Sequence, residues 1–243
     1  MPISAPRKLA LLAAALFSAS TGTAQLVVNI DFNAVVGTFS GQGAFSDPGH
    51  DFWNGVSSTA GGSNFTASDG TTATGVSMSV SNVFGLGFGG VPTLASDLLA
   101  DYLFVGSNTT ATFTISGLTA GQAYDFYLYS VAGGSGTTNR AAIFTLEGVS
   151  QNVSALNVAS FTEGTNFVLF HLTPGGTSVN GSFVVAPGHA EAELNGLQIV
   201  AVPESSTLAY GSLGSAMILT RAVFLRRRRQ RSALGSARST AAA

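Results

Sequence analysis

The side chains best suited to binding chemistry stand together in the stretch HDFWNGV, residues 50–56. Trp53 is the only tryptophan of the chain, and Asp51 and Asn54 lie within two residues of it. Protein sites for sugars combine an aromatic ring with carboxylate and amide groups that hydrogen-bond the sugar hydroxyls. Asp51, Trp53 and Asn54 are therefore the predicted carbohydrate-binding residues. The alternative for Trp53 is a place in the hydrophobic core.

Aspartates near this stretch supply a candidate metal site. Ca²⁺ is held by clustered oxygen ligands, above all the carboxylates of Asp and Glu. Asp47, Asp51 and Asp69 come from one glycine-rich region and form the predicted calcium site. Calcium is the one cofactor that the sequence suggests. The alternative is that these acids are solvated surface residues, since the alternating acids of an EF-hand loop are absent.

Carboxylates in pairs could also hydrolyse glycosides, which requires two of them about 5–10 Å apart. The candidate pairs are Asp47 with Asp51, Asp97 with Asp101, and Glu191 with Glu193. Eleven acids lie between residues 26 and 202, so such pairs also arise by chance, and solvated surface is the alternative interpretation.

Other kinds of catalysis find no support in the motifs. His50, His171 and His189 are far apart and lack the HExxH spacing of zinc enzymes. The chain has no Gly-x-Ser-x-Gly elbow and no phosphate-binding loop that ends in lysine. We therefore expect a protein that is not an enzyme and assign no catalytic residue. A polysaccharide-active enzyme that uses one of the carboxylate pairs is the alternative.

The elements that must position these residues are β-strands. Apolar and polar residues alternate in eight stretches, and this period of two predicts strands with one buried face. The stretches are residues 26–33, 74–83, 109–118, 123–131, 140–148, 166–174, 177–187 and 192–202. Glycine-rich turns separate them, and neighbouring strands are expected to pair as hairpins. The predicted fold class is all-β, with residues 25–202 forming a single β-sandwich of the jelly-roll type.

Two stretches of the body depart from this pattern. VPTLASDLLADYLF, residues 91–104, has apolar residues at four-residue spacing and predicts one or two helical turns ahead of a strand. GLGFGGVP, residues 85–92, is expected to be a loop, because it lacks the strand, helix and distal acid of a dinucleotide site.

Charge is strongly segregated along the chain. Between residues 26 and 202 there are eleven carboxylates and one cation, Arg140, which is a formal charge of −10. Such a body repels polyanions, so binding to nucleic acid is excluded. The chain has no cysteine and therefore no disulfide and no thiolate nucleophile.

The N-terminus has the three parts of a secretory signal peptide. Arg7 and Lys8 precede the apolar run LALLAAALF, and small residues follow it up to Ala24. Residues 1–24 are the predicted signal peptide, cleaved between Ala24 and Gln25, with an uncleaved anchor as the alternative. The expected partners for this step are the export translocon and signal peptidase.

The C-terminus has the features of a membrane segment. Residues 207–225 are the predicted transmembrane helix, and the four arginines that follow predict a cytoplasmic end, with residues 230–243 as a disordered cytoplasmic tail. The uninterrupted apolar run has only 13 residues, 208–220, because Arg221 interrupts it. A hydrocarbon core of about 30 Å needs about 20 helical residues, so the segment is short for a permanent anchor.

Residues 203–229 and the residue before them resemble a known sorting signal. Val202-Pro203-Glu204, a Ser/Thr spacer, the apolar helix and the run Arg226, Arg227, Arg228 and Arg229 look like the PEP-CTERM signal. The resemblance implies processing by a membrane transpeptidase of the exosortase type. Ser205 stands where the family motif has a second proline, and a simple single-span anchor is the alternative.

The body also resembles a known class of extracellular domain. VNIDFN, FWNGV, SGLTAGQAYDFYLYS, IFTLEG, FTEGTNFVLF and LNGLQIV resemble, in this order, the galactose-binding-like jelly rolls that are often fused to PEP-CTERM signals. The expected protein is thus exported, held in the inner membrane in transit, and then placed on the bacterial surface or in the extracellular matrix. Its expected role is non-catalytic binding of exopolysaccharide or a structural role beside it.

Overall fold

The computed structural model describes residues 25–34, 37–46, 48–89, 94–131 and 139–203. The chain divides into two compact units, residues 1–202 and 203–243, and every described strand belongs to the first. The elements are β1 (Val27–Phe32), β2 (Asn54–Val56), β3 (Gly61–Gly62), β4 (Ser77–Ser81), β5 (Gly85–Phe88), α1 (Ser96–Ala100), β6 (Asp101–Gly106), β7 (Thr110–Ser116), β8 (Tyr124–Tyr129), β9 (Ala142–Leu146), β10 (Val149–Val153), β11 (Phe167–Leu172), β12 (Ser178–Val185), β13 (Glu191–Leu194) and β14 (Gly196–Ala201).

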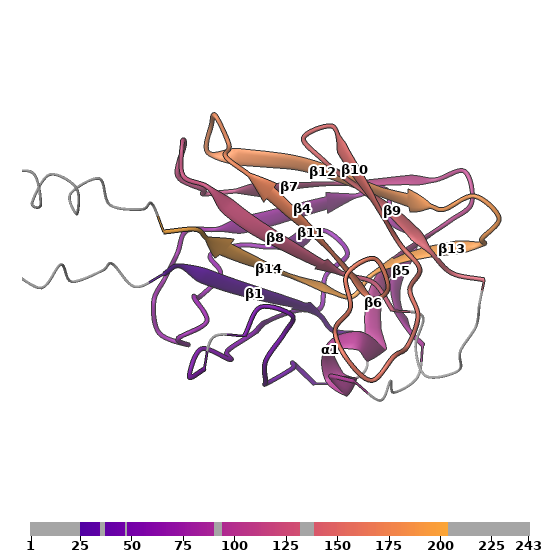
Figure 1. Ribbon diagram of the computed structural model, residues 1–243, viewed down its shortest axis with the longest axis horizontal. Helices are drawn as coiled ribbons and strands as arrows, with labels where there is room; N and C mark the ends of the chain where they lie inside the picture. The colour runs from indigo at the N-terminus through magenta and orange to yellow at the C-terminus, as the bar shows by residue number, and fades with distance from the viewer. Residues whose placement is uncertain (1–24, 35–36, 47, 90–93, 132–138, 204–243) are drawn as a thin grey trace, which may run out of the picture. The chain divides into compact units, whose positions relative to one another are not determined.

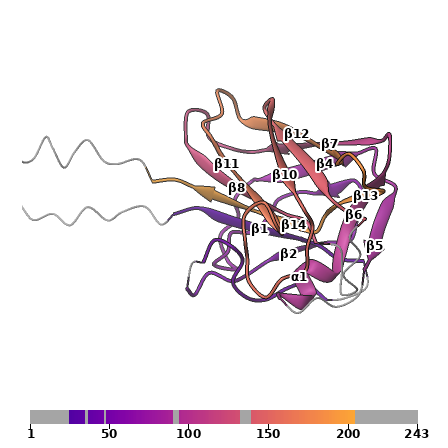
Figure 2. The ribbon, with the colours of Figure 1, turned by 45° about the vertical axis from the view of Figure 1, so that its right-hand side comes forward.

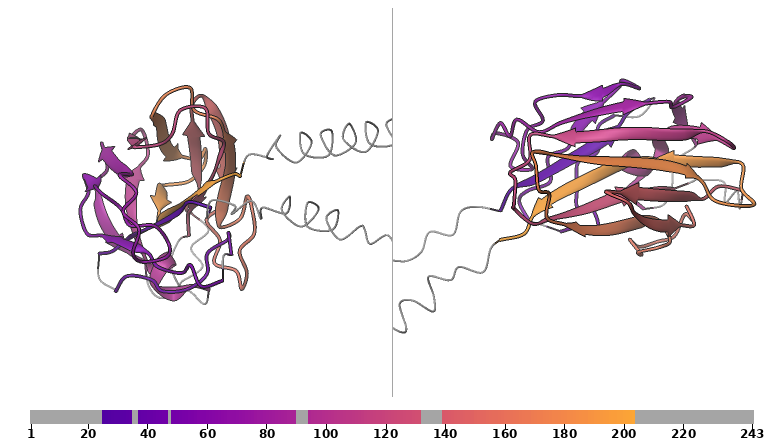
Figure 3. Two further views of the ribbon diagram at one scale, coloured as in Figure 1. Left: turned by 90° about the vertical axis from the view of Figure 1, so that its left-hand side faces the viewer. Right: turned by 90° about the horizontal axis from the view of Figure 1, so that it is seen from above.

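The strands form three sheets. A five-stranded sheet has the order β11-β8-β14-β1-β2, a six-stranded sheet the order β10-β9-β12-β7-β4-β3, and a small sheet the order β13-β6-β5. In Figure 1 the six-stranded sheet lies above the five-stranded one, and Figure 3 shows the two layers from the end and from above. The small sheet lies beside them, at the right of Figure 2. The described chain is nearly all-β, consistent with the predicted sandwich, and the jelly-roll type stays a prediction.

The main core lies between the two large sheets. Alternate side chains of β1, β8 and β14 meet those of β7, β9 and β12, as the period of two requires. Phe126, Phe144 and Phe183 are among the largest side chains there and are fully buried. Phe144 packs on Phe183 with 5.8 Å between ring centroids. The small sheet adds Leu103 and Val105 to the same core.

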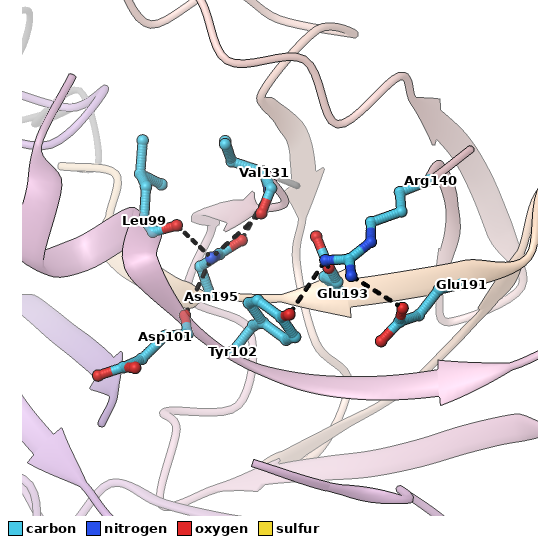
Figure 4. A network of polar contacts seen from close by, with 8 residues as sticks. All are labelled: Leu99, Asp101, Tyr102, Val131, Arg140, Glu191, Glu193 and Asn195. Atoms are coloured by element: carbon cyan, nitrogen blue, oxygen red, sulfur yellow. Dashed lines mark hydrogen bonds and ion pairs between the residues drawn. The ribbon is translucent and has the colours of Figure 1, made fainter. Parts of the chain in front are cut away.

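Most predicted strands are confirmed, with one division. The stretch 192–202, predicted as one strand, is two: β13 belongs to the small sheet and β14 to the five-stranded sheet. Asn195 separates them. Its side chain accepts a hydrogen bond from the Val131 N–H (2.7 Å) and donates to the carbonyl oxygens of Leu99 (3.0 Å) and Asp101 (2.9 Å). The buried amide thus fixes the point at which the chain changes sheets (Figure 4).

The hairpin prediction is wrong for the two glycine-rich turns it rested on, since neither β7 and β8 nor β8 and β9 pair. β5 pairs with β6 and β9 with β10, both antiparallel, but β5 and β10 were not predicted as strands. β7 and β8 do not pair, because the turn around Gly117–Gly121 carries the chain from the six-stranded to the five-stranded sheet. The helix prediction is confirmed by α1, which β6 follows directly. The predicted loop 85–92 is wrong in part, since β5 is the edge strand of the small sheet.

A segment without regular structure covers the outer face of the five-stranded sheet. Residues 37–46 and 48–53, here called the covering segment, are tied to that sheet by buried polar side chains. Gln198 on β14 accepts a hydrogen bond from the Phe45 N–H (3.0 Å) and donates to Asn29 Oδ1 on β1 (2.9 Å). Tyr129 accepts from the Ala44 N–H (2.6 Å). The polar side chains on this face of the sheet therefore form hydrogen bonds with the backbone of the covering segment.

The terminal predictions lie almost wholly outside the described residues. The predicted positions outside the described residues are Ala24 of the signal-peptide site, Glu204, Arg226 to Arg229, the helix 207–225 and the tail 230–243. Of the named positions, Gln25, Val202 and Pro203 are described, and β14 ends at Ala201 just before the last two. Where the structure describes the chain, it contains no helix long and apolar enough to span a membrane.

Candidate binding groove

An open groove of about 700 Å³ lies along one edge of the sandwich. β2 is the outermost strand of the five-stranded sheet and β3 the outermost strand of the six-stranded sheet, and both line the groove. The lining residues are Thr38, Phe39, Ser40, Asp51, Phe52, Trp53, Asn54, Gly55, Val56, Ser57, Ser58, Gly61, Gly62, Ser63 and Phe65. The predicted carbohydrate-binding residues therefore all border one groove, although they contribute to it in different ways.

The side-chain amide of Asn54 is hydrogen-bonded to the backbone beside the groove and leaves little free for a ligand. Its Nδ2 donates to the carbonyl oxygens of Asn29 and Thr66, both at 2.8 Å, and its Oδ1 accepts from the Thr66 N–H at 2.8 Å. These three bonds use most of what the amide can form. The prediction of Asn54 as a ligand-binding group is corrected accordingly: its amide joins β2 to its two neighbouring segments.

Trp53 lies in the core and not on the surface. Its side chain is 2% exposed, and its Nε1–H donates to the carbonyl oxygen of Gly41 at 2.9 Å. The ring packs edge-on against Phe39, with centroids 5.3 Å apart, and against Tyr129 at 6.1 Å. Of the two alternatives for Trp53, the structure favours the core, because neither ring face is open to stack on a sugar. The tryptophan instead anchors the covering segment.

Phe52 is an exposed aromatic residue of the groove lining and is not among the residues predicted from the sequence to bind a ligand. Its side chain is 42% exposed, and Ser40 of the covering segment pairs with it in an isolated antiparallel bridge. Side chains alternate in direction along an extended chain, so Phe52 and Trp53 must point to opposite sides. That rule, applied to Asp51-Phe52-Trp53-Asn54, was the signal available in the sequence.

The buried carboxyl group of Asp31 holds one lining residue of the groove, Phe39, in place. Asp31 on β1 is fully buried, and its Oδ2 accepts a hydrogen bond from the Phe39 N–H at 2.8 Å, which fixes Phe39 at the rim. Its Oδ1 has no hydrogen-bond partner. Burial raises the pKa of Asp31 to about 7, and the nearby carboxylates of Asp101 and Asp97 add to the rise. The hydrogen bond from Phe39 works in the opposite direction.

The predicted calcium site is not assembled by the residues that the structure describes. Asp47 lies outside them. Asp69 is exposed, and its carboxylate accepts hydrogen bonds from the N–H groups of Thr71 and Thr72, both at 2.8 Å, and from the Thr72 hydroxyl at 2.5 Å. These bonds hold the pKa of Asp69 below its usual range. Among the described residues no group of three or more Asp, Glu or His side chains is arranged to hold a metal ion.

The pair Glu191 and Glu193 is engaged by Arg140 (Figure 4). Nη2 of Arg140 lies 3.2 Å from Oε2 of Glu191, and Nη1 contacts Oε1 of Glu193. The guanidinium also lies 5.5 Å from the ring centroid of Tyr102 and donates to its hydroxyl at 3.0 Å. Burial raises the pKa of Glu193 and the charge of Arg140 opposes that rise. These groups join β13 to β6 and are not open to a substrate.

The remaining candidates for catalysis are dispersed. Asp101 is fully buried at the end of α1, whereas Asp97 is exposed. His171 is exposed on β11 and its Nδ1 lies 2.6 Å from Oδ1 of Asp125 on the neighbouring strand. None of these four residues lines the groove.

A second, smaller hollow adjoins the groove. It has a volume of about 360 Å³ and shares Gly61, Gly62 and Ser63 with the groove. Its other lining residues are Ala60, Ser77, Met78, Ser79 and Ser116. The surface open to a ligand therefore continues across β3, with serine hydroxyls on both sides of the strand.

Comparisons with known proteins find only distant likenesses. No family model matches the chain, and no curated protein matches it. A plant complex of the peptide RALF23 with FER and LLG2 is 14% identical over 75% of this chain and 42% of that chain, with a TM-score of 0.41. A structural-genomics protein from Bacillus subtilis is 17% identical over 73% and 40%, with a TM-score of 0.35.

An exo-β-1,3-galactanase from Phanerochaete chrysosporium, solved with β-1,3-galactotriose, is 12% identical over 55% of this chain and 31% of that chain, with a TM-score of 0.33. The chain thus spans less than half the length of each of these three structures. Likenesses of this size carry no conclusion about function.

Proposed function

We propose that the protein is a non-catalytic carbohydrate-binding module that holds polysaccharide in the groove beside β2. The observation that carries the proposal is the groove itself, whose lining includes an exposed aromatic residue, Phe52, and an exposed carboxylate residue, Asp51. An aromatic face stacks on the apolar face of a sugar ring, and a carboxylate accepts hydrogen bonds from its hydroxyls. Ser57, Ser58 and Ser63 add hydroxyl groups along the same groove.

The size of the surface favours a chain of sugars over a single one. The groove of about 700 Å³ and the adjoining hollow of about 360 Å³ share Gly61, Gly62 and Ser63, so one ligand can extend across both. Gly61 and Gly62 carry no side chain that would rise between the two spaces. A polysaccharide, or an oligosaccharide of several units, fits this arrangement.

The carboxylates of the groove support the proposal of a non-catalytic role. Among its described lining residues, Asp51 is the one carboxylate, whereas both common mechanisms of glycoside hydrolysis need two. Of the other candidate pairs, Glu191 and Glu193 are bound to Arg140. Sugar released from any polymer by the purified protein, and lost in the variant Asp51→Asn, would favour the alternative, a polysaccharide-active enzyme.

The place of action proposed for the module is the cell surface or the extracellular matrix. Two features of the sequence support it: the signal-peptide pattern of residues 1–24 and the PEP-CTERM-like pattern that begins at Val202. The intact mass of the protein recovered from producing cells tests this part. A chain that begins at Gln25 and ends near Glu204 agrees with export and exosortase-type processing, and a chain that retains Arg229 contradicts that processing.

Binding to immobilised polysaccharides by the full chain, purified in mild detergent, tests the carbohydrate proposal. We expect Phe52→Ala to weaken binding about 10-fold, since loss of a stacking ring removes ~1.4 kcal/mol. Phe88→Ala is the matched control, because Phe88 is 43% exposed, Phe52 is 42% exposed, and Phe88 lies on β5 outside the groove. Equal losses in the two variants, or no binding of the unchanged protein to any glycan, would contradict the proposal.

A further inference from the structure

The described body has no free cation to offer to a ligand. Arg140 is the only lysine or arginine between residues 9 and 220, and its guanidinium is bound to Glu191 and Glu193. Its side chain is only 24% exposed. Acidic sugars are normally held by Arg or Lys, which pair with their carboxylate or sulfate groups. Among the residues that the structure describes, no lysine or arginine is available to the groove.

The groove adds a negative charge of its own. Asp51 is exposed at the rim, and the other described polar side chains of the lining are the uncharged groups of Thr38, Ser40, Asn54 and the serines of residues 57, 58 and 63. The body around it carries eleven carboxylates against one arginine. A uronate or sulfate brought next to Asp51 would meet a like charge, and none of the described lining residues carries a positive charge.

We propose that the groove selects uncharged polysaccharides and rejects acidic ones, an inference that rests on the proposed carbohydrate-binding function. Hydroxyls of a neutral sugar donate to the Asp51 carboxylate and exchange hydrogen bonds with the serine hydroxyls. The same contacts work against a polymer that bears carboxylates, because Asp51 can only accept hydrogen bonds. The negative charge of the whole body slows the approach of such a polymer as well.

A chemically matched pair of ligands tests the inference. The full chain is screened against neutral β-glucans and galactans and against polygalacturonate and alginate, each with and without Ca²⁺. The primary hydroxyls of the neutral polymer that binds best are then oxidised to carboxylates. We expect the oxidised polymer to bind at least about 10-fold more weakly at low salt, and part of the loss to be recovered at about 0.5 M NaCl, where charges are screened.

A variant locates the effect in the groove. Asp51→Asn keeps the size of the side chain and removes its charge, so it is expected to reduce the discrimination against the oxidised polymer about 3-fold or more. Glu163→Gln is the control, because Glu163 is an exposed acid outside the groove, and it should leave the discrimination unchanged.

The outcomes separate the two proposals. Stronger binding of native polygalacturonate or alginate than of any neutral polymer, with or without Ca²⁺, would overturn the inference and leave carbohydrate binding in place. Undiminished binding after oxidation would overturn it too. Salt-sensitive preference for glucosamine oligomers over their N-acetylated counterparts would also overturn it, in favour of a cationic glycan. Failure to bind every polymer would instead refute the carbohydrate-binding function.

Discussion

The substitution Asp31→Asn is expected to make the protein more stable at pH 8 than the unchanged chain. Asp31 is fully buried, one of its oxygens has no hydrogen-bond partner, and its pKa is raised to about 7 from the ordinary 3.8. A carboxyl whose pKa is raised by folding favours the folded state only while it is protonated. Its ionisation therefore costs stability as the pH rises from about 4 to about 7.

The size of that cost follows from the two pKa values. A difference of about 3 pH units corresponds to ~4 kcal/mol, because each unit is worth ~1.4 kcal/mol. The full cost is present above pH 7 and absent below pH 4. Asparagine removes the charge and keeps an oxygen that can accept from the Phe39 N–H. Its amide nitrogen needs an acceptor in a buried place, which costs ~1–3 kcal/mol. The net gain at pH 8 is then about 1–3 kcal/mol.

Urea unfolding of both proteins at pH 5 and pH 8 measures the effect, since the difference between variant and unchanged chain cancels every other titrating group. The advantage of Asp31→Asn should grow by about 2–3 kcal/mol from pH 5 to pH 8. A carbon-13 titration of the Asp31 carboxyl should have its midpoint near pH 7. An advantage that stays constant with pH, or that shrinks towards pH 8, would refute the reasoning.

Three further substitutions test how the groove and sheets are supported, each by urea unfolding. Gly43→Ala should lose about 1–3 kcal/mol, because the added carbon would lie within 2.6 Å of a buried tyrosine hydroxyl, and Gly175→Ala, with open space around it, should change little. Asn195→Ala should cost about 3 kcal/mol or more, since it leaves buried backbone groups without partners, and a loss below 1 kcal/mol would contradict that role. Arg140→Met should cost about 2–4 kcal/mol and more at pH 9 than at pH 6, because Glu193 must then ionise without its partner; a loss that does not grow with pH would count against this pairing.

The alternation of apolar and polar residues predicted most of the sandwich, and its failures have physical causes. β2, β3 and β5 are short and glycine-rich, so they bury too few side chains to produce a visible period. β13 and β14 were predicted as one strand because apolar and polar residues alternate through most of residues 192–202 without a visible break. Their division depends on Asn195, whose hydrogen bonds reach residues about 64 to 96 positions away in the chain.

The pairing of β7 with β8 was predicted from nearness in the sequence and is wrong for a related reason. Both strands alternate well, and the turn between them is short. Such a turn can close a hairpin within one sheet or cross from one sheet to the other, and the local residues do not distinguish the two. In this protein β7 pairs instead with β4 and β12, which come from distant parts of the chain.

The three residues predicted to bind carbohydrate all line the candidate groove, but the exposed aromatic residue beside them is Phe52 and Trp53 is buried. The covering segment explains this difference. On β8 and β14, Tyr129 and Gln198 alternate with core residues and therefore look solvent-facing in the sequence. They are buried, because the covering segment lies over them and bonds to them through its backbone. Within the covering segment the side chain of Trp53 points into the core, so that of the neighbouring Phe52 must turn outward, and Phe52 is an exposed residue of the groove lining. At such an edge, the burial of one aromatic side chain decides that its neighbour in the sequence is exposed to a ligand. The sequence shows that Phe52 and Trp53 face opposite sides, but not which of the two is buried.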